Sequence, residues 1–155
     1  MLSMEPIEAR SDARRKRIPA GVADVYAALC DAARVARWWG PDGFKNSIHE
    51  FDFRPGGAWK LTMHGPDGRD YPNESRFVRI ITNQLVQIEH LSAPHFLLSI
   101  ELHEQGGDTL VAWQQTFDTV EHFERISAFI AAANEQNLER LFNEVQGLPN
   151  ITRTS

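Results

Sequence analysis

Apolar and polar residues alternate through the middle of the chain, and this period of two predicts β-strands. Glycine, proline, asparagine and aspartate separate the alternating stretches, so consecutive strands are expected to pair as an antiparallel meander. Pro72 lacks an N–H group, and it predicts an edge, a bulge or a loop before residue 76. The expected strands cover residues 9–18, 48–53, 58–64, 76–81, 85–91, 96–103 and 109–117.

Apolar positions three and four residues apart mark the helices. A short helix is expected over Val22–Cys30, and a second over 31–38 with Asp31 as its N-cap. A long helix is expected over Val120–Gln146, a stretch without proline or internal glycine, and Gly147 follows it as a typical helix end. The pattern therefore predicts an α+β domain with two short helices after the first strand, about six further strands and one long C-terminal helix.

Tryptophans gather where helices and strands meet turns. Trp38 and Trp39 directly precede Gly40 and Pro41, and Trp59 follows a Gly-Gly turn. Neighbouring residues on a helix point about 100° apart, so the first two rings face different ways. We expect Trp38 to pack the short helices onto the sheet and Trp39 to face a cavity.

Four segments together carry a family resemblance. They are the helical segment Val25-Tyr26-Ala27-Ala28-Leu29, the Trp-rich turn 37–44, the strand and Gly-Gly hairpin of 51–59, and the hairpin 63–68 with Tyr71. Their combination resembles the family named after homologues of the activator of heat-shock protein 90 ATPase, within the START-like (SRPBCC) helix-grip superfamily. The resemblance spans residues 9–145. It implies a curved antiparallel sheet of six or seven strands wrapped around the long helix.

The resemblance also implies domain limits and a cavity between sheet and helix. One helix-grip domain is expected over 9–147, with flexible termini at 1–8 and 148–155. Relatives often carry Gly-Trp in the last helix, whereas this chain has Ala131-Ala132-Ala133 with Phe129, which implies a larger or differently filled cavity. Small helical residues would leave room opposite large aromatic walls, unless these aromatics fill one solid core. The expected ligand-binding residues are Trp39, Phe51, Trp59, Tyr71, Trp113, Gln115, Phe129, Ala133 and Asn137.

Catalytic and metal-binding patterns are weak. Strand alternation places His49 on the same face as Phe51, and His49 with Glu74 is the best candidate acid–base pair. The six histidines are scattered, with none of the helical His or Glu spacings of a metal site. The helical pattern makes Cys30 a core residue rather than a nucleophile. We therefore expect neither a metal nor an organic cofactor.

The composition limits the classes of binding partner that we expect. A net charge of −5 argues against nucleic acid and anionic membranes, and the basic run 14–17 is interpreted as a solvated strand face. No apolar stretch approaches the about 20 residues that span a bilayer. A single cysteine and the lack of an apolar leader favour a reducing cytoplasm.

Three functions remain open from the sequence. The first is a cytoplasmic protein that binds an apolar or amphipathic small molecule between sheet and helix. The second, suggested by helix-grip relatives, is an enzyme of the polyketide cyclase, dehydratase or hydrolase type. The third is a chaperone-interacting module of the kind that the family name describes. Residues 92–95 are a candidate sheet edge for a homodimer.

Overall fold

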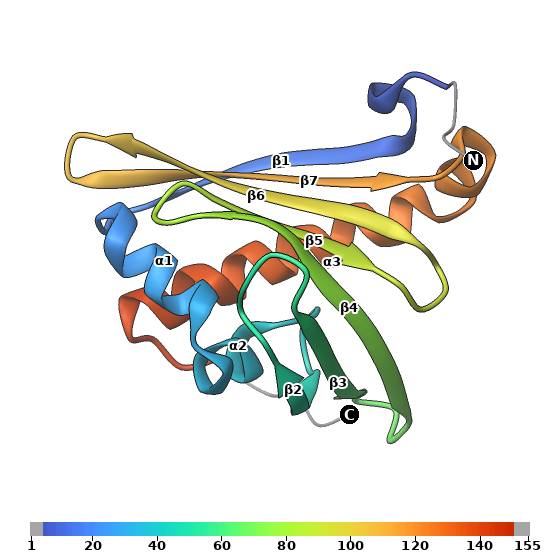
Figure 1. Ribbon diagram of the computed structural model, residues 1–155, viewed down its shortest axis with the longest axis horizontal. Helices are drawn as coiled ribbons and strands as arrows, with labels where there is room; N and C mark the ends of the chain where they lie inside the picture. The colour runs from blue at the N-terminus through green and yellow to red at the C-terminus, as the bar shows by residue number, and fades with distance from the viewer. Residues whose placement is uncertain (1–4, 151–155) are drawn as a thin grey trace.

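Seven strands form one antiparallel sheet in the computed structural model, which describes residues 5–150 (Figure 1). The strand order is β1-β7-β6-β5-β4-β3-β2. The strands are β1 Ser11–Ile18, β2 Lys45–Phe51, β3 Ala58–His64, β4 Asp70–Ile81, β5 Leu85–His90, β6 Phe96–Gln105 and β7 Asp108–Phe117. The helices are the 3₁₀ helix η1 Ile7–Arg10, α1 Val22–Cys30, α2 Ala32–Trp38 and α3 Val120–Gln146.

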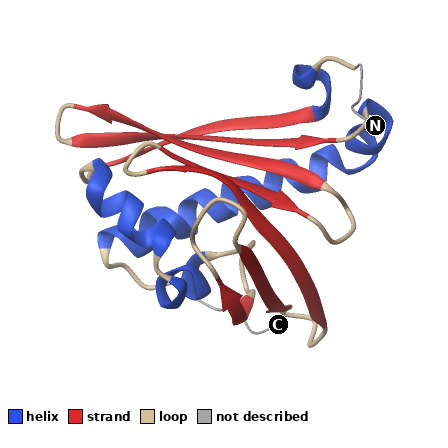
Figure 2. Cartoon of the chain, in the orientation of Figure 1, coloured by secondary structure: helices blue, strands red, loops and turns tan. Residues whose placement is uncertain are grey.

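The long helix α3 lies along one face of the curved sheet, and α1 and α2 lie beside its C-terminal half (Figures 1 and 2). Thr119 caps its start, because the hydroxyl accepts a hydrogen bond from the His122 amide. Gly147 ends it in the left-handed conformation, with φ of 72°. The predicted α+β helix-grip architecture is confirmed. No helix in the described part of the chain is long and apolar enough to cross a membrane.

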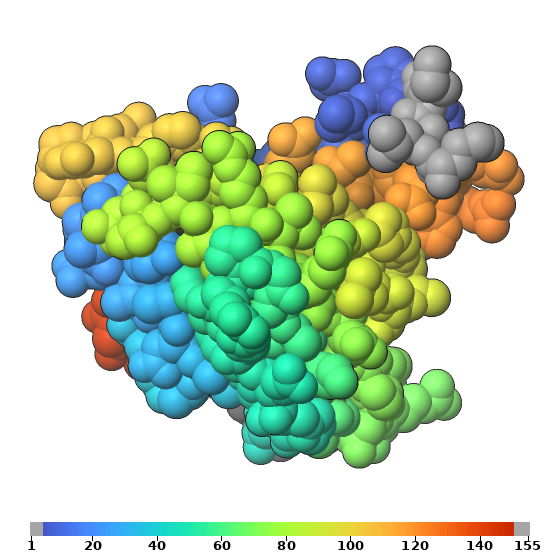
Figure 3. Space-filling model, viewed as in Figure 1, coloured from blue at the N-terminus to red at the C-terminus, as the bar shows by residue number. Residues whose placement is uncertain are grey.

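The core lies between the concave face of the sheet and the helices. Along β7, buried and half-buried residues alternate, so one face of the strand points to α3 and the other points away. Figure 3 shows the strand side of the molecule, where β2 to β6 cover most of the surface. The largest fully buried side chains are Trp38, Trp59, Trp113, Phe77 and Phe117.

Strand β4 is longer than the alternation predicted. It begins at Asp70 and includes Pro72, which is paired with Thr62 of β3. On the other side, the pairing with β5 reaches only to Ser75. Pro72 therefore lies where β4 has a single neighbouring strand, and a residue without an N–H is tolerated there.

The basic run of β1 is not simply a solvated face. Arg14 and Lys16 point toward α3 and form ion pairs with Glu135 and Glu139, at 2.7 and 2.8 Å. Arg15, between them, is exposed. The run therefore follows strand alternation, with every second residue binding the long helix.

The expected flexible termini are described in part. Residues 1–4 and 151–155 lie outside the described part of the chain. Inside it, Ile7–Arg10 forms η1, and the chain after α3 bonds back to the helix. The amide of Leu148 donates to Asn143 O at 2.8 Å, and Asn150 Nδ2 donates to Arg140 O at 3.0 Å.

Candidate functional site

A pocket of about 620 Å³ lies between the sheet and the middle of α3. The segment after α2, strands β3 to β7 and one face of α3 all contribute to its lining. Most lining side chains are apolar, and none of those described is a lysine or arginine. The fold thus places a mainly apolar surface, interrupted by several polar side chains, around a space large enough for a small molecule.

Eight of the nine expected ligand-binding residues line this pocket: Trp39, Trp59, Tyr71, Trp113, Gln115, Phe129, Ala133 and Asn137. The ninth, Phe51, packs behind Trp59 with its ring 5.3 Å from that of Phe77. Ala132, which precedes Ala133 on α3, is exposed and does not line the pocket. Whether these side chains contact a ligand stays a prediction.

Trp38 and Trp39 differ in their surroundings, but their rings do not point apart as expected, because the ring centroids lie 5.5 Å apart in an edge-to-face contact. Trp39 lies outside the helix, so the angle between neighbouring helical residues does not apply to it. Trp38 is buried, and its Nε1 donates to Ala28 O at 2.9 Å, which joins α2 to α1. Trp39 has left the helix and caps it, with an extended backbone. Its ring lies 4.7 Å from Trp59 and 6.1 Å from Trp113, so the three rings form one aromatic cluster at the pocket wall.

A buried guanidinium holds the Trp-rich turn against α3. Arg140 exposes 7% of its surface and forms no ion pair within the described chain. Burial lowers the pKa of Arg140 from its ordinary value. Its two terminal nitrogens lie 2.8 to 3.1 Å from five backbone carbonyl oxygens, those of Arg37, Trp39, Gly40, Pro41 and Phe44. One helical side chain therefore shapes the whole turn.

Asn137 completes this attachment. Its Oδ1 accepts from the Gly40 amide at 3.2 Å, and its Nδ2 donates to Trp38 O at 3.1 Å. Gly40 has φ of 93°, and a Cβ there would lie 2.7 Å from Met63 Cε. The amide of Asn137 is thus engaged by the protein backbone, so this residue positions the pocket wall.

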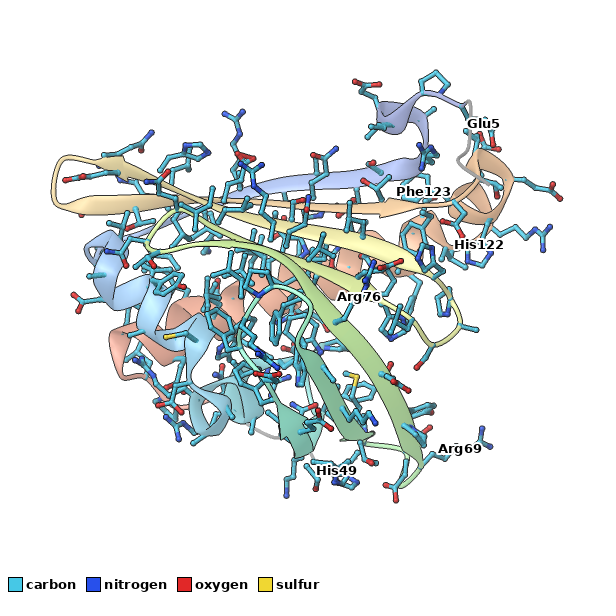
Figure 4. The ribbon with its side chains drawn as sticks, in the orientation of Figure 1. Glu5, His49, Arg69, Arg76, His122 and Phe123 are labelled. Atoms are coloured by element: carbon cyan, nitrogen blue, oxygen red, sulfur yellow. The ribbon has the colours of Figure 1, made fainter. Side chains whose placement is uncertain are left out.

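His49 and Glu74 point away from the pocket. The expectation that His49 lies on the same face as Phe51 is wrong, because a β-bulge between Ile48 and Glu50 interrupts the alternation. His49 is exposed at the margin of the molecule, with Nε2 2.8 Å from Thr62 Oγ1 (Figure 4). Glu74 is also exposed and lies on the outer face of β4. Neither residue lines the pocket.

His90 is the histidine that does line the pocket, and the sequence did not single it out. It ends β5 and stacks on Phe96 at 4.5 Å. Burial lowers the pKa of His90, which favours the neutral ring. Nδ1 lies 2.8 Å from Pro94 O and Nε2 lies 2.6 Å from Asn73 Oδ1, so both nitrogens face protein oxygens. The alternation of β5 carried the signal that was missed, because His90 lies on the same face as the buried Val86 and Ile88.

The described residues give little support for a metal-ion site or for Cys30 as a nucleophile. Among residues 5–150, no group of three or more His, Cys, Asp or Glu side chains is arranged to hold a metal ion. Cys30 is half-buried at the end of α1, and burial raises the pKa of its thiol. A raised pKa keeps the sulfur protonated near neutral pH, which is unfavourable for a nucleophile.

His95, in the β5–β6 turn beside the pocket, makes contacts whose contribution to stability depends on pH. His95 lies 2.7 Å from both Glu89 and Asp118, and these hydrogen bonds raise the pKa of His95. Its stabilising contribution is complete below the unfolded pKa of about 6.5 and is lost as pH rises through the higher folded value. We expect the difference in unfolding free energy between the wild type and His95→Gln to shrink between pH 6 and 9.

The expected size of this difference is below about 1 kcal/mol, because the His95 side chain is 43% exposed and water screens the pair. Urea unfolding of both proteins across this pH range measures it. A difference that stays constant with pH, or grows, would contradict the assignment.

Comparison with known proteins now identifies the fold family. The model of the family described as Activator of Hsp90 ATPase homolog 1-like protein matches residues 19–146, most of the chain. The chain belongs to this family. Membership in the Activator of Hsp90 ATPase homolog 1-like family is compatible with binding of a ligand or of a chaperone. A search of curated proteins finds no match.

Solved structures agree with the family assignment at the level of the fold. A protein from Arthrobacter aurescens is 19% identical, with a TM-score of 0.85 over 94% of this chain and 91% of that one. A protein from Nitrosomonas europaea is 16% identical, with a TM-score of 0.82 over 92% and 99% of the two chains. An AHSA1-like protein from Aeromonas hydrophila is 16% identical, with a TM-score of 0.71 over 92% and 98%.

Proposed function

We propose that the protein binds a small, largely apolar molecule in the pocket between the sheet and α3. The pocket itself carries this proposal. Its volume of about 620 Å³ lies within the range of small-molecule sites, and its walls are mainly aromatic and aliphatic. Ala133 supports it further, because a small side chain on α3 leaves the space open opposite Trp39, Trp59 and Trp113.

The titratable side chains around the pocket favour binding over acid–base catalysis. Among the described lining residues they are Asp70, Tyr71 and His90. Asp70 is 2.7 Å from His64 Nδ1, and Tyr71 donates to Asp67 at 2.7 Å. Both nitrogens of His90 face protein oxygens. Each group already has a hydrogen-bond partner within the protein, so acid–base chemistry on a substrate would compete with these contacts.

Filling the pocket tests the proposal. Ala133→Trp places an indole in the space, and we expect it to weaken binding of the neutral fluorophore 1-aminoanthracene at least tenfold. The matched control is Ala132→Trp, on the exposed side of the same helical turn, which should bind the fluorophore as the wild type does. Fluorescence titration gives the affinities, and native mass spectrometry of protein from its own host detects any molecule retained in the pocket.

The controls make the result decisive. Equal binding by Ala133→Trp and the wild type would place the fluorophore elsewhere and contradict the proposal. Absence of binding to the wild type, together with no retained molecule in the mass spectrum, would also contradict it. Circular dichroism confirms that both variants keep the fold before their affinities are compared.

A further inference from the structure

Two side-chain amides meet on the pocket wall, one from the sheet and one from α3. Gln115 of β7 and Asn134 of α3 are 7% and 6% exposed, and both line the pocket. Asn134 Nδ2 donates to Gln115 Oε1 at 2.9 Å. The same Nδ2 donates to Asp12 Oδ2 of β1 at 3.0 Å. The two amides therefore form a fixed pair, connected to a carboxylate behind them.

The carboxylate determines which way each amide points. Asp12 is paired with Arg14, with Oδ2 2.8 Å from Nε and Oδ1 3.1 Å from Nη2. An ionised carboxylate only accepts hydrogen bonds, so Asn134 must present its NH₂ group to Asp12. Gln115 must then present its oxygen to that NH₂ group. The orientation of both amides follows from the ion pair, and the opposite assignment would place two oxygens against each other.

This arrangement leaves one acceptor and one donor free. Within residues 5–150, Asn134 Oδ1 and Gln115 Nε2 have no hydrogen-bond partner. Among the described residues, four side-chain polar atoms lack a hydrogen-bond partner and are also shielded from solvent: Asn46 Oδ1, Trp59 Nε1, Trp113 Nε1 and His122 Nε2. Asn134 Oδ1 and Gln115 Nε2 do not belong to this group. Both atoms are therefore accessible, and the pocket is the space that the two residues line.

The other polar groups of the lining are distant from this pair, enclosed or already bonded. Ser75 Oγ has no hydrogen-bond partner among the described residues, but it lies on β4, three strands away from β7. The indole nitrogens of Trp59 and Trp113 are enclosed by protein, so a molecule in the pocket does not reach them. The amide of Asn137 is bound to Gly40 and Trp38. Polar recognition in this part of the pocket thus falls to Gln115 and Asn134, side by side.

From this geometry we infer that the pocket selects a neutral apolar molecule carrying a carboxamide or lactam group, whose C=O accepts from Gln115 Nε2 and whose N–H donates to Asn134 Oδ1. The inference rests on the proposed function and adds the polar group that the ligand carries. An adjacent acceptor and donor match the free pair, and both new hydrogen bonds form away from bulk water.

Related groups fit less well. A carboxylate has two acceptor oxygens, so one of them would face Asn134 Oδ1 with no proton between them. It would also be buried without a cation, since no described lining residue is a lysine or arginine. A ketone satisfies Gln115 and leaves Asn134 unpaired. The pocket should therefore rank an amide above an isosteric ketone and above a carboxylate.

The experiment compares three probes of one shape: 2-naphthamide, 2-acetylnaphthalene and 2-naphthoate. Calorimetry at pH 7.5 gives their affinities for the wild type. We expect the amide to bind about tenfold more tightly than the ketone, in line with one additional buried hydrogen bond, and the carboxylate to bind more weakly than the amide. This ranking is measured on the unaltered protein, so it does not depend on whether a variant folds.

Variants then assign the preference to the amide pair. Asn134→Leu keeps the shape of the side chain and removes the acceptor that only the amide uses, so amide and ketone should bind equally. Gln115→Met removes the donor that both probes use, so it should weaken both and keep their ratio. Gln114→Met is the matched control for Gln115→Met on the other face of β7 and should bind both probes as the wild type does. Asp12→Asn frees Asn134 to turn over, and it should reduce the preference while ketone binding is retained.

Each outcome separates this inference from the proposed function. Equal binding of amide and ketone by the wild type, with both weakened by Ala133→Trp, would overturn the inference and leave the pocket proposal standing. A preference that survives Asn134→Leu would also overturn it. Failure of all three probes and of 1-aminoanthracene to bind would overturn both.

Discussion

Arg140→Met is expected to lower the free energy of unfolding by about 3 kcal/mol or more. The substitution keeps the length and most of the apolar stem, and it removes the donors that five backbone carbonyls share. Buried acceptors left without a donor cost about 1 to 3 kcal/mol each, and some of these carbonyls will recover partners by moving. Urea unfolding followed by tryptophan fluorescence measures the change.

The fluorescence of the folded variant should change as well, because Trp38 and Trp39 belong to the turn that loses its attachment. Arg125→Met is the control on the same helix. Arg125 is 69% exposed and forms a surface pair with Glu121, so its loss should cost less than about 0.5 kcal/mol. Equal effects of the two substitutions would show that the buried guanidinium does not support the turn.

Gly57→Ala is expected to destabilise the protein by about 3 kcal/mol. Gly57 is buried in the turn before β3, and a Cβ there would clash with the carbonyl oxygen of Asp52. That oxygen belongs to the backbone, so relief requires the whole turn to move. The turn is also bonded to β4, since the Gly57 carbonyl accepts from the Phe77 amide at 2.9 Å. Calorimetric melting compares the variant with the wild type.

Gly107→Ala provides the matched comparison. Gly107 lies in the β6–β7 turn, and no atom lies within 4 Å of the position that an alanine Cβ would take there. The substitution should therefore change stability by less than about 0.5 kcal/mol. A small effect at Gly57 would mean that the turn adapts without cost. A large effect at both sites would show that turns in general, rather than the Asp52 contact, decide the outcome.

Local signals were sufficient for the helices and for most of the pocket wall. The bounds of α3 match the sequence prediction, because a long periodic stretch without glycine or proline is followed by Gly147. The N-cap role of Asp31 is confirmed, since its side chain accepts from the Ala33 amide at 3.0 Å. Trp39 faces the pocket because the helix ends between it and Trp38. These features depend on residues adjacent in the chain.

Features that depend on strand register, or on contacts between residues far apart in the chain, were not predicted from the sequence. A single inserted residue at the bulge of β2 moves His49 to the outer surface, and alternation has no means of showing a bulge. Asp12, Gln115 and Asn134 lie on three elements that are far apart in the chain, and no spacing connects them. Arg140 resembles any surface arginine of a helix until the turn that it holds is in place.

The attachment of the turn by Arg140 has a consequence for motion. Because one guanidinium binds carbonyls from Arg37 to Phe44, we expect this turn and α3 to move together. The opposite rim of the pocket is formed by Tyr71 and by the β5–β6 turn at Pro94. Within the described chain, Tyr71 and Pro94 form no hydrogen bond with α3. If a molecule binds in the pocket, we therefore expect its entry to displace the sheet-side rim rather than the turn held by Arg140.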